Sequence, residues 1–269
     1  MTKIETDGFL SDDAVEGRAI FRERFSEMFA LAEDLNRVAV AKLGEVKLSN
    51  IDESRWVLYL LSIRIIESYE AIVILMERGM LTPAKLIIRP LLEALFTLAA
   101  LEKDKKLIAK YFDAEKEAHF LLLRSSTQWR NEDLKKIFKK SKLEAKFIQK
   151  KEERKVSPPA FLSPLEWAKV ASYEDFYHFY YAQYSSFTHS NLSALEDHME
   201  RDGEEKVEAS FGPTVTGFND LLIDAMSFTL LSVMHTCSAF HLEIDLDADR
   251  IQAGLQKLHM ANNLGQPVV

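Results

Sequence analysis

Apolar side chains recur every three or four positions along most of the chain, which is the spacing of α-helices. In the first such segment they form one stripe, made of Phe21, Phe25, Met28, Ala32, Leu35 and Ala39. The pattern predicts helices at 12–43, 52–79, 82–101, 104–129, 131–155, 173–199, 218–242 and 247–262. We therefore expect an all-α protein, a long-helix bundle of about seven helices with a helical hairpin appended at 104–155.

Capping and helix-breaking residues support these boundaries. Asp52 is placed to cap the second helix, and Gly79 to follow its last turn. Pro90 lies inside the third helix and is expected to kink it. Asn131 is expected to cap the fifth helix, whose inward stripe should be Leu134, Ile137, Phe138, Ala145 and Ile148. Residues 157–164 form the clearest loop, and 206–211 suit a short extended piece.

Length and composition narrow the class of protein. A chain of 269 residues can bury one large core, so we expect a single helical domain at 1–269 with a protruding hairpin at 104–155. Only 9 glycines and 7 prolines are present, which disfavours turn-rich all-β folds. The single cysteine, Cys237, allows no internal disulfide and favours the cytoplasm. Residues 1–10 lack the apolar centre of a signal peptide.

Two apolar stretches are long enough to be compared with membrane spans. Residues 56–75 contain three charged side chains, and residues 221–242 contain Asp224 and His235. A charge at the centre of a bilayer costs several kcal/mol. We therefore expect both stretches to be helices buried in protein, and no membrane partner.

The charge of the chain is uneven. Residues 130–155 hold eleven Lys or Arg and five Asp or Glu, a local net charge of +6, whereas the whole chain carries −8. The remaining residues therefore carry −14. The basic segment is interpreted as a solvated helix face, or as a surface for an acidic partner such as nucleic acid. The candidate contacts to nucleic acid are Lys135, Lys136, Lys139 and Lys140.

Two constellations place polar residues in apolar helices. Arg89 and Glu93 share one helix face at a spacing of four within an apolar segment. Tyr181, Ser185 and His189 follow the same spacing in the aromatic-rich helix. Each set is either a structural pairing inside the core or a functional site, in which the arginine binds an anion and the hydroxyls and imidazole bind phosphate or relay a proton. We expect the two helices to pack side by side, with Arg89 or Glu93 within hydrogen-bonding reach of the second set.

The two constellations carry a family resemblance. The segment from Gly79 to Glu93, followed about ninety residues later by Tyr181, Ser185 and His189, resembles a family of uncharacterised bacterial all-helical proteins, a domain of unknown function. The resemblance covers residues 55–240. A more distant similarity links the chain to HEPN-type helical domains, several of which are ribonucleases or toxin components in defence systems. The Arg-x(4–6)-His motif typical of HEPN ribonucleases is absent, so an Arg–His pair would have to form between helices.

Other chemistries find little support in the sequence. A di-iron carboxylate bundle needs Glu-x-x-His motifs, and the nearest segment is Asp175-x-x-His178. Asp245, Asp247 and Asp249 resemble the start of an EF-hand loop, but Arg250 stands at the glycine position. No glycine-rich phosphate loop, dinucleotide fingerprint or zinc spacing occurs. We expect no metal and no cofactor.

Two hypotheses about function remain. In the first, the chain is a helical interaction or regulatory module, a homodimer whose polar cluster is architectural. In the second, it is a HEPN-like effector acting on RNA or a nucleotide, with Arg89, Glu93, Tyr181, Ser185 and His189 in one cleft. An open pocket at these residues favours the second hypothesis, and a closed, internally paired cluster favours the first.

Overall fold

The computed structural model shows the all-α class and the appended helical hairpin that the sequence predicts. It describes residues 7–49, 52–126, 128–141, 143–156, 160–188, 195–202, 206–209, 211–244 and 246–263. A two-stranded hairpin, β1 (Met199–Asp202) and β2 (Lys206–Ala209), is the sheet in this part of the chain. The expected extended piece at 206–211 is therefore confirmed as β2.

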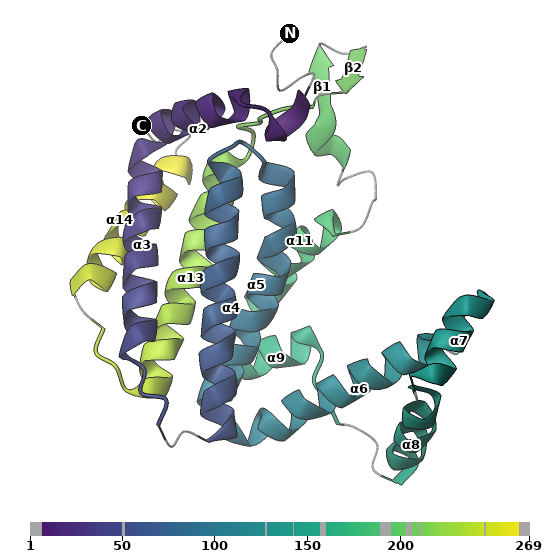
Figure 1. Cartoon of the computed structure of the whole chain (residues 1–269). Helices are drawn as coiled ribbons and strands as arrows, with labels where there is room; N and C mark the ends of the chain where they lie inside the picture. The colour runs from purple at the N-terminus through teal and green to yellow at the C-terminus, as the bar shows by residue number, and fades with distance from the viewer. Residues whose placement is uncertain are drawn as a thin grey trace.

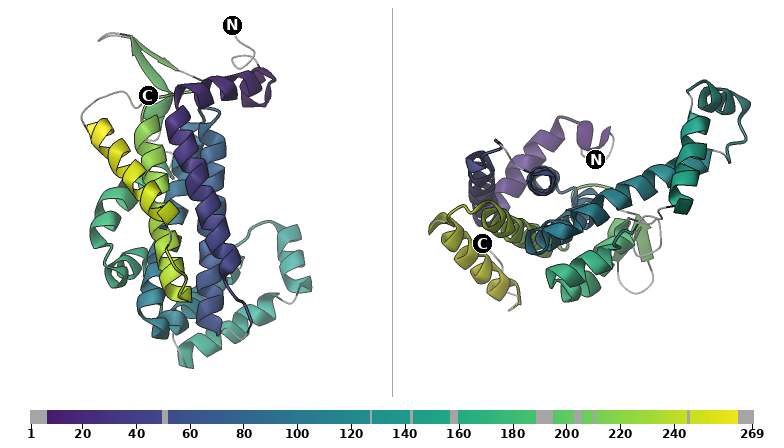
Figure 2. Two further views of the ribbon diagram at one scale, coloured as in Figure 1. Left: turned by 90° about the vertical axis from the view of Figure 1, so that its left-hand side faces the viewer. Right: turned by 90° about the horizontal axis from the view of Figure 1, so that it is seen from below.

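The core lies between three long helices. Helices α4 (Glu53–Met76) and α5 (Leu81–Lys103) form an antiparallel pair, and α13 (Phe218–Phe240) packs against both. Helices α3 (Ser26–Glu45) and α14 (Leu246–Asn263) cover α13 on the other side (Figures 1 and 2). The largest fully buried side chains include Tyr69, Phe29, Phe96, Phe218, Phe228, Leu58, Ile65 and Ile72. Helix α5 continues through Pro90, and Asp52 caps α4 by accepting from the Arg55 amide.

The first predicted helix is divided in two. Helix α2 (Asp13–Arg24) ends at Phe25, whose backbone leaves the helical region, and α3 begins at Ser26. The Phe25 ring stacks on Phe218 of α13 at a centroid distance of 3.8 Å. Sequence periodicity continues across this break, because both pieces contribute their apolar stripe to the same core. The prediction of one continuous helix at 12–43 is therefore wrong.

The appended hairpin is an arm, which we define as residues 108–156. The short 3-10 turn η2 (Lys105–Leu107) leads into α6 (Ile108–Ser126), and the chain folds back through α7 (Glu132–Lys140) and α8 (Leu143–Val156). The three helices project from one end of the bundle (Figures 1 and 2). The single helix predicted at 131–155 is corrected to two, although Asn131 caps the first of them as expected.

The predicted inward stripe of the arm is wrong for most of its members. Only Phe138 is buried, against the Trp129 ring at 6.2 Å. The exposed members are Leu134, Ile137, Ala145 and Ile148. Helical periodicity identifies an apolar face, but it does not reveal whether the same chain supplies the surface that covers it.

The predicted helix at 173–199 is also shorter and irregular. After α9 (Pro164–Ala171), the chain forms α10 (Glu174–Phe176), a π-helical turn η3 (Tyr177–Tyr181) and α11 (Ala182–Phe187). The 3-10 turn η4 (Glu196–His198) then leads directly into β1. The π-helical turn stacks Tyr177 on Tyr181 at 4.7 Å, which directs Tyr181 towards α5.

Helix α13 is the one described helix that is long and apolar enough to cross a membrane. About 67% of its most apolar window is buried inside the protein, so it is a core helix in this structure. Its small polar residues also have partners, because the hydroxyls of Ser62 on α4 and Thr236 on α13 lie 2.7 Å apart. Cys237 is buried in the same helix, as expected.

The turn between α4 and α5 requires glycine at position 79. Gly79 has a φ of +69°, and a Cβ there would lie 2.6 Å from the Phe21 ring and 2.7 Å from Pro213. The Gly79 carbonyl also accepts from the Thr214 amide at 3.1 Å. The segment at 211–216 is thus held against the start of α5 by close backbone approach.

We predict that Gly79→Ala lowers the free energy of unfolding by about 2 kcal/mol or more, because it adds both a left-handed backbone penalty and a steric overlap. Chemical denaturation measures the change. The matched control is Gly44→Ala in α3, where a Cβ meets nothing within 4 Å. In the Gly44→Ala variant the free energy of unfolding should rise by up to about 1 kcal/mol. Equal effects at the two positions would contradict the close packing at Gly79.

Candidate functional site

The two sequence-predicted constellations meet through Arg89, Glu93 and Tyr181. The Arg89 Nε donates to Glu93 Oε1 and lies 3.2 Å from it, and it lies 3.2 Å from the Tyr181 hydroxyl. That hydroxyl donates to the same Glu93 oxygen at 2.7 Å. The Arg89 guanidinium also lies over the Tyr181 ring, 5.3 Å from its centroid. The expected proximity of the two helices is therefore confirmed for these three residues.

The polar stripe on α5 is longer than the sequence suggested. Arg89 also donates through Nη1 to the Thr188 hydroxyl at 2.9 Å. One turn earlier, Lys85 Nζ contacts both carboxylate oxygens of Asp197, at 2.8 and 2.7 Å. Thr82 donates to the same carboxylate at 3.1 Å. Thr82, Lys85, Arg89 and Glu93 thus form one face of α5, and their partners are Tyr181 in η3, Thr188 after α11 and Asp197 in η4.

The charges along this stripe are paired. Arg89 is matched by Glu93, and Lys85 by Asp197. The Arg89–Glu93 pair is not deeply buried: the two side chains are 30% and 40% exposed. Tyr181 itself is buried, and burial together with the bond to Glu93 raises the pKa of its phenol. The cluster is a neutral, internally bonded network at the edge of the core.

Ser185 and His189 are placed differently from the other members. The Ser185 hydroxyl oxygen is buried and has no hydrogen-bond partner among the described residues, while its backbone carbonyl accepts from Thr188. His189 lies outside the described residues. Thr188, which the sequence reading missed, takes the place of Ser185 as the hydroxyl on Arg89. The position of Thr188 between Ser185 and His189, in the sequence Ser-Ser-Phe-Thr-His, is the signal that could have identified it.

Two further polar networks connect residues 173–187, which we call the aromatic segment, to α13. The Tyr184 hydroxyl donates to Asp224 at 2.7 Å, and burial raises the pKa of Asp224 to about 6 against the opposing effect of that bond. The Tyr173 hydroxyl lies 2.7 Å from His235 Nε2, and Glu102 lies 3.5 Å from His235 Nδ1. The charges within the apolar segment at 221–242 were the signal for both networks, since buried polar groups need partners.

The arm contains a second group of sequence-predicted residues. Lys136, Lys139 and Lys140 are exposed, and Lys135 is half-exposed. Lys135 and Lys136 pair with acidic neighbours on the same helix, Glu132 and Asp133, at 2.6 and 3.1 Å. Among the residues that the structure describes, Lys139 and Lys140 form no ion pair. Lys139 is still near enough to Glu132 to contribute to the lowered pKa of that carboxyl, so what these two lysines lack is a close ion pair.

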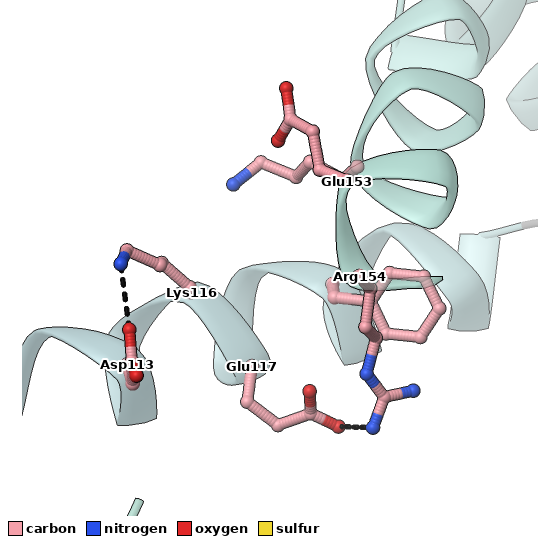
Figure 3. Close-up of a pocket in the computed structure, with 7 residues that line it drawn as sticks. Asp113, Lys116, Glu117, Glu153 and Arg154 are labelled. Atoms are coloured by element: carbon pink, nitrogen blue, oxygen red, sulfur yellow. Dashed lines mark hydrogen bonds and ion pairs between the residues drawn. The ribbon is translucent and has the colours of Figure 1, made fainter. Parts of the chain in front are cut away.

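A cavity of about 220 Å³ lies in the arm between α6 and α8. Figure 3 shows the Arg154 side chain of α8 directed at Glu117 of α6. The Arg154 guanidinium also lies over the Phe120 ring, 4.7 Å from its centroid. The Arg154–Glu117 contact is 2.7 Å, and the Glu117 side chain is almost completely buried. Phe120 also stacks on Phe147 at 5.5 Å. These contacts hold α8 firmly against α6.

A larger cavity of about 310 Å³ lies at the opposite end of the bundle, where α5 begins. Its walls come from the α4–α5 turn, from η4 and β1, from the segment at 211–216 and from Phe9. Phe9 and Phe211 meet edge to face at 5.9 Å. Thr82 and Asp197 also line it, so it adjoins the polar stripe of α5, whereas Arg89 does not line it.

No group of three or more His, Cys, Asp or Glu side chains suited to a metal ion occurs within the described ranges. The carboxylates of the stripe are already used, since Glu93 accepts from Arg89 and Tyr181, and Asp197 accepts from Lys85 and Thr82. The carboxylates of the α5 stripe are therefore better suited to hydrogen bonds between segments of the chain than to binding a metal ion.

Comparison with known proteins identifies a family. A family model described as a family of unknown function (DUF5677) matches residues 55–206. The matched region contains α4, α5, the arm, and the segment that carries Tyr181 and Ser185. No curated protein and no solved structure matches the chain.

We predict that Glu93→Ala lowers the free energy of unfolding by about 1–2 kcal/mol, because Tyr181 and Arg89 lose a shared acceptor. The partial exposure of Glu93 makes this smaller than the 3–5 kcal/mol typical of a fully buried ion pair. Urea denaturation measures the loss. Glu93→Gln keeps an acceptor oxygen and should lose less than half as much. A loss in the alanine variant no larger than that of an exposed control, Glu67→Ala, would show that the network carries no stability.

We predict a pH-dependent gain from Asp224→Asn. The pKa of Asp224 in the folded state, about 6, is above its ordinary value of 3.8, so the folded protein binds a proton at Asp224 more tightly than the unfolded chain does. This proton binding stabilises the fold fully below pH 3.8, and the stabilisation is lost as the pH rises through about 6. At about pH 8 the asparagine variant should be more stable than the wild type by about 1–2 kcal/mol, since it removes a buried charge. The difference should vanish towards pH 4 in denaturation curves, and a constant difference would contradict it.

Proposed function

Given that the chain belongs to a family of unknown function (DUF5677), we propose from its geometry that it is a helical interaction module that forms a homodimer through its arm. The bundle acts as the scaffold, and the arm supplies the contact surface. The polar stripe on α5 is architectural in this account, because its charges neutralise one another. The single buried cysteine favours the cytoplasm as the compartment.

The observation that carries the proposal is the exposure of apolar side chains on the arm. Six large ones are exposed in the single chain: Phe112, Leu121, Leu122, Leu134, Ile137 and Ile148. Leu122 is 67% and Ile137 is 58% exposed. Complete burial of a fully exposed side chain of this kind contributes about 1.5–3 kcal/mol, and covering these partly exposed ones contributes roughly half of that each. Other exposed apolar residues are spread over the bundle, whereas these six share one projecting element, as is typical of a protein–protein contact surface.

The arm is also rigid enough to act as a preformed surface. The buried Glu117–Arg154 pair, with Arg154 packed over the Phe120 ring, fastens α8 to α6 (Figure 3). The capped start of α7 and the Phe138–Trp129 contact hold the tip. An ordered element loses little conformational entropy when it binds, which favours association.

The charge distribution favours a second copy of the chain as the partner. The arm segment at 130–155 carries +6, whereas the rest of the chain carries −14. A copy of the same chain therefore offers both the acidic surface that attracts these lysines and an arm of its own. Complementary charge of this kind raises the association rate and sets the orientation of the partners.

A second candidate function is a HEPN-like effector that acts on RNA or a nucleotide. It is favoured by one observation, the buried Ser185 hydroxyl without a partner beside a cluster that contains Arg89, Glu93 and Tyr181. His189 would supply the imidazole. The pairing of Arg89 with Glu93 weakens this reading, because a phosphate would have to compete with a carboxylate for the guanidinium.

A binding titration with short single- and double-stranded RNA separates the two candidates. Tight, salt-dependent binding that is lost when Lys135, Lys136, Lys139 and Lys140 are changed to Glu would favour the effector. We expect weak binding without sequence preference, since no aromatic residue on the outer face of α7 is available to stack on bases.

For the homodimer, we predict that wild-type protein sediments as a dimer and that Ile137→Glu sediments as a monomer. The substitution places a charge on the contact surface, where burial is costly. Sedimentation equilibrium over a range of protein concentrations measures the mass.

The matched control is Ile74→Glu on α4, which is 53% exposed and lies away from the arm. This variant should remain dimeric. A monomeric wild type, or dissociation by Ile74→Glu with no effect of Ile137→Glu, would contradict the arm as the contact surface. Circular dichroism of both variants confirms that the helices remain folded.

A further inference from the structure

The end of the bundle that carries β1 and β2 has the features of a receiving surface. We call residues 7–16, 195–202, 206–209 and 211–216 the hairpin end. Its cavity of about 310 Å³ is lined by Phe9, Met199 and Phe211. Six large apolar side chains in these ranges are exposed: Leu10, Val15, Leu195, Met199, Phe211 and Val215. An open cavity with an exposed apolar rim is typical of a surface that binds another chain.

The hairpin end is also strongly acidic. Residues 7–16, 195–202 and 206–209 contain nine Asp or Glu and two Lys or Arg, a net charge of −7. Half of the −14 outside residues 130–155 thus falls within these three ranges, and Glu196 and Asp197 line the cavity itself. Asp7 and Glu196 are exposed there and carry no ion pair within the described part of the chain.

The arm has the complementary character. Its tip combines exposed Leu134 and Ile137 with the unpaired Lys139 and Lys140. The arm leaves the bundle at the end opposite to β1 and β2, and the two surfaces stand apart within one chain (Figure 1). The turn at Gly79, which fixes the 211–216 wall, also holds the hairpin end in place.

We propose that the hairpin end receives the α7 tip of a second copy, with Leu134 and Ile137 over the cavity and Lys140, which follows Ile137 by three residues on the same side of the helix, against Asp7 and Glu196. Lys139 adds to the positive charge at this end of α7. This inference rests on the proposed homodimer and names the surface that the arm contacts. Because each copy has one arm and one hairpin end, a two-fold axis produces two identical contacts and a closed dimer.

A charge-exchange experiment tests the pairing. The arm variant is Lys139→Glu with Lys140→Glu, and the hairpin-end variant is Asp7→Lys with Glu196→Lys. Each variant alone places like charges at both contacts, so the dimer dissociation constant should rise about tenfold or more at low salt. An equimolar mixture should recover wild-type affinity, because a mixed dimer has one native contact and one contact with both charges exchanged. Sedimentation with one variant fluorescently labelled measures the mixed dimer.

The outcomes separate this inference from the proposed function. Recovery in the mixture supports the pairing of the two surfaces. If the arm variant dissociates while the hairpin-end variant stays dimeric, the homodimer is supported but the pairing of the arm with the hairpin end is overturned. A wild-type chain that stays monomeric overturns both. The control Glu67→Lys, an exposed acid on α4, should change the dissociation constant by less than about twofold, and an equal effect there would show that net charge alone is responsible.

Discussion

The packing of α13 against the α4–α5 pair is the constraint on which the rest of the molecule depends. It buries the apolar faces of three long helices and leaves the charged residues of α13 at the edge of the core. Asp224 and His235 then need partners, and the chain supplies them from one aromatic segment through Tyr184 and Tyr173. The same segment brings Tyr181 to Arg89 and Glu93. The candidate site is thus a consequence of how the core places its polar residues.

Much of this arrangement could be predicted from the sequence, because burial against a neighbouring helix imposes a period near 3.6 on the chain. The bounds of α4, α5, α13 and α14 followed from that period and from the cap at Asp52. Periodicity failed where two helices share one core stripe, as at Phe25, and where a π-helical turn at Tyr177–Tyr181 interrupts the predicted regular helix. The contact of Arg89 and Glu93 with Tyr181 was predicted, whereas the bonds of Lys85 to Asp197 and of Arg89 to Thr188 depend on long-range folding.

The arm shows what a sequence pattern leaves open. Its apolar residues have the spacing of a buried face, yet Leu134, Ile137 and Ile148 meet solvent in the single chain. The pattern identifies an apolar face, and our proposal that a second copy covers it is based on the charge difference between the arm and the rest of the chain. In this account the interaction surface is built from a rigid, fastened arm and an acidic, apolar end of the same fold, which is why one chain is sufficient to form the complex.

The most direct measurement is amide hydrogen exchange of the wild-type protein over a range of concentrations. If the arm is covered by a second copy, protection of residues 132–140 should rise with protein concentration, together with protection of the segment at 211–216. The centre of α13 should exchange slowly and independently of concentration, because it is buried within each chain. Fast exchange of α7 that stays the same at every concentration would contradict the account.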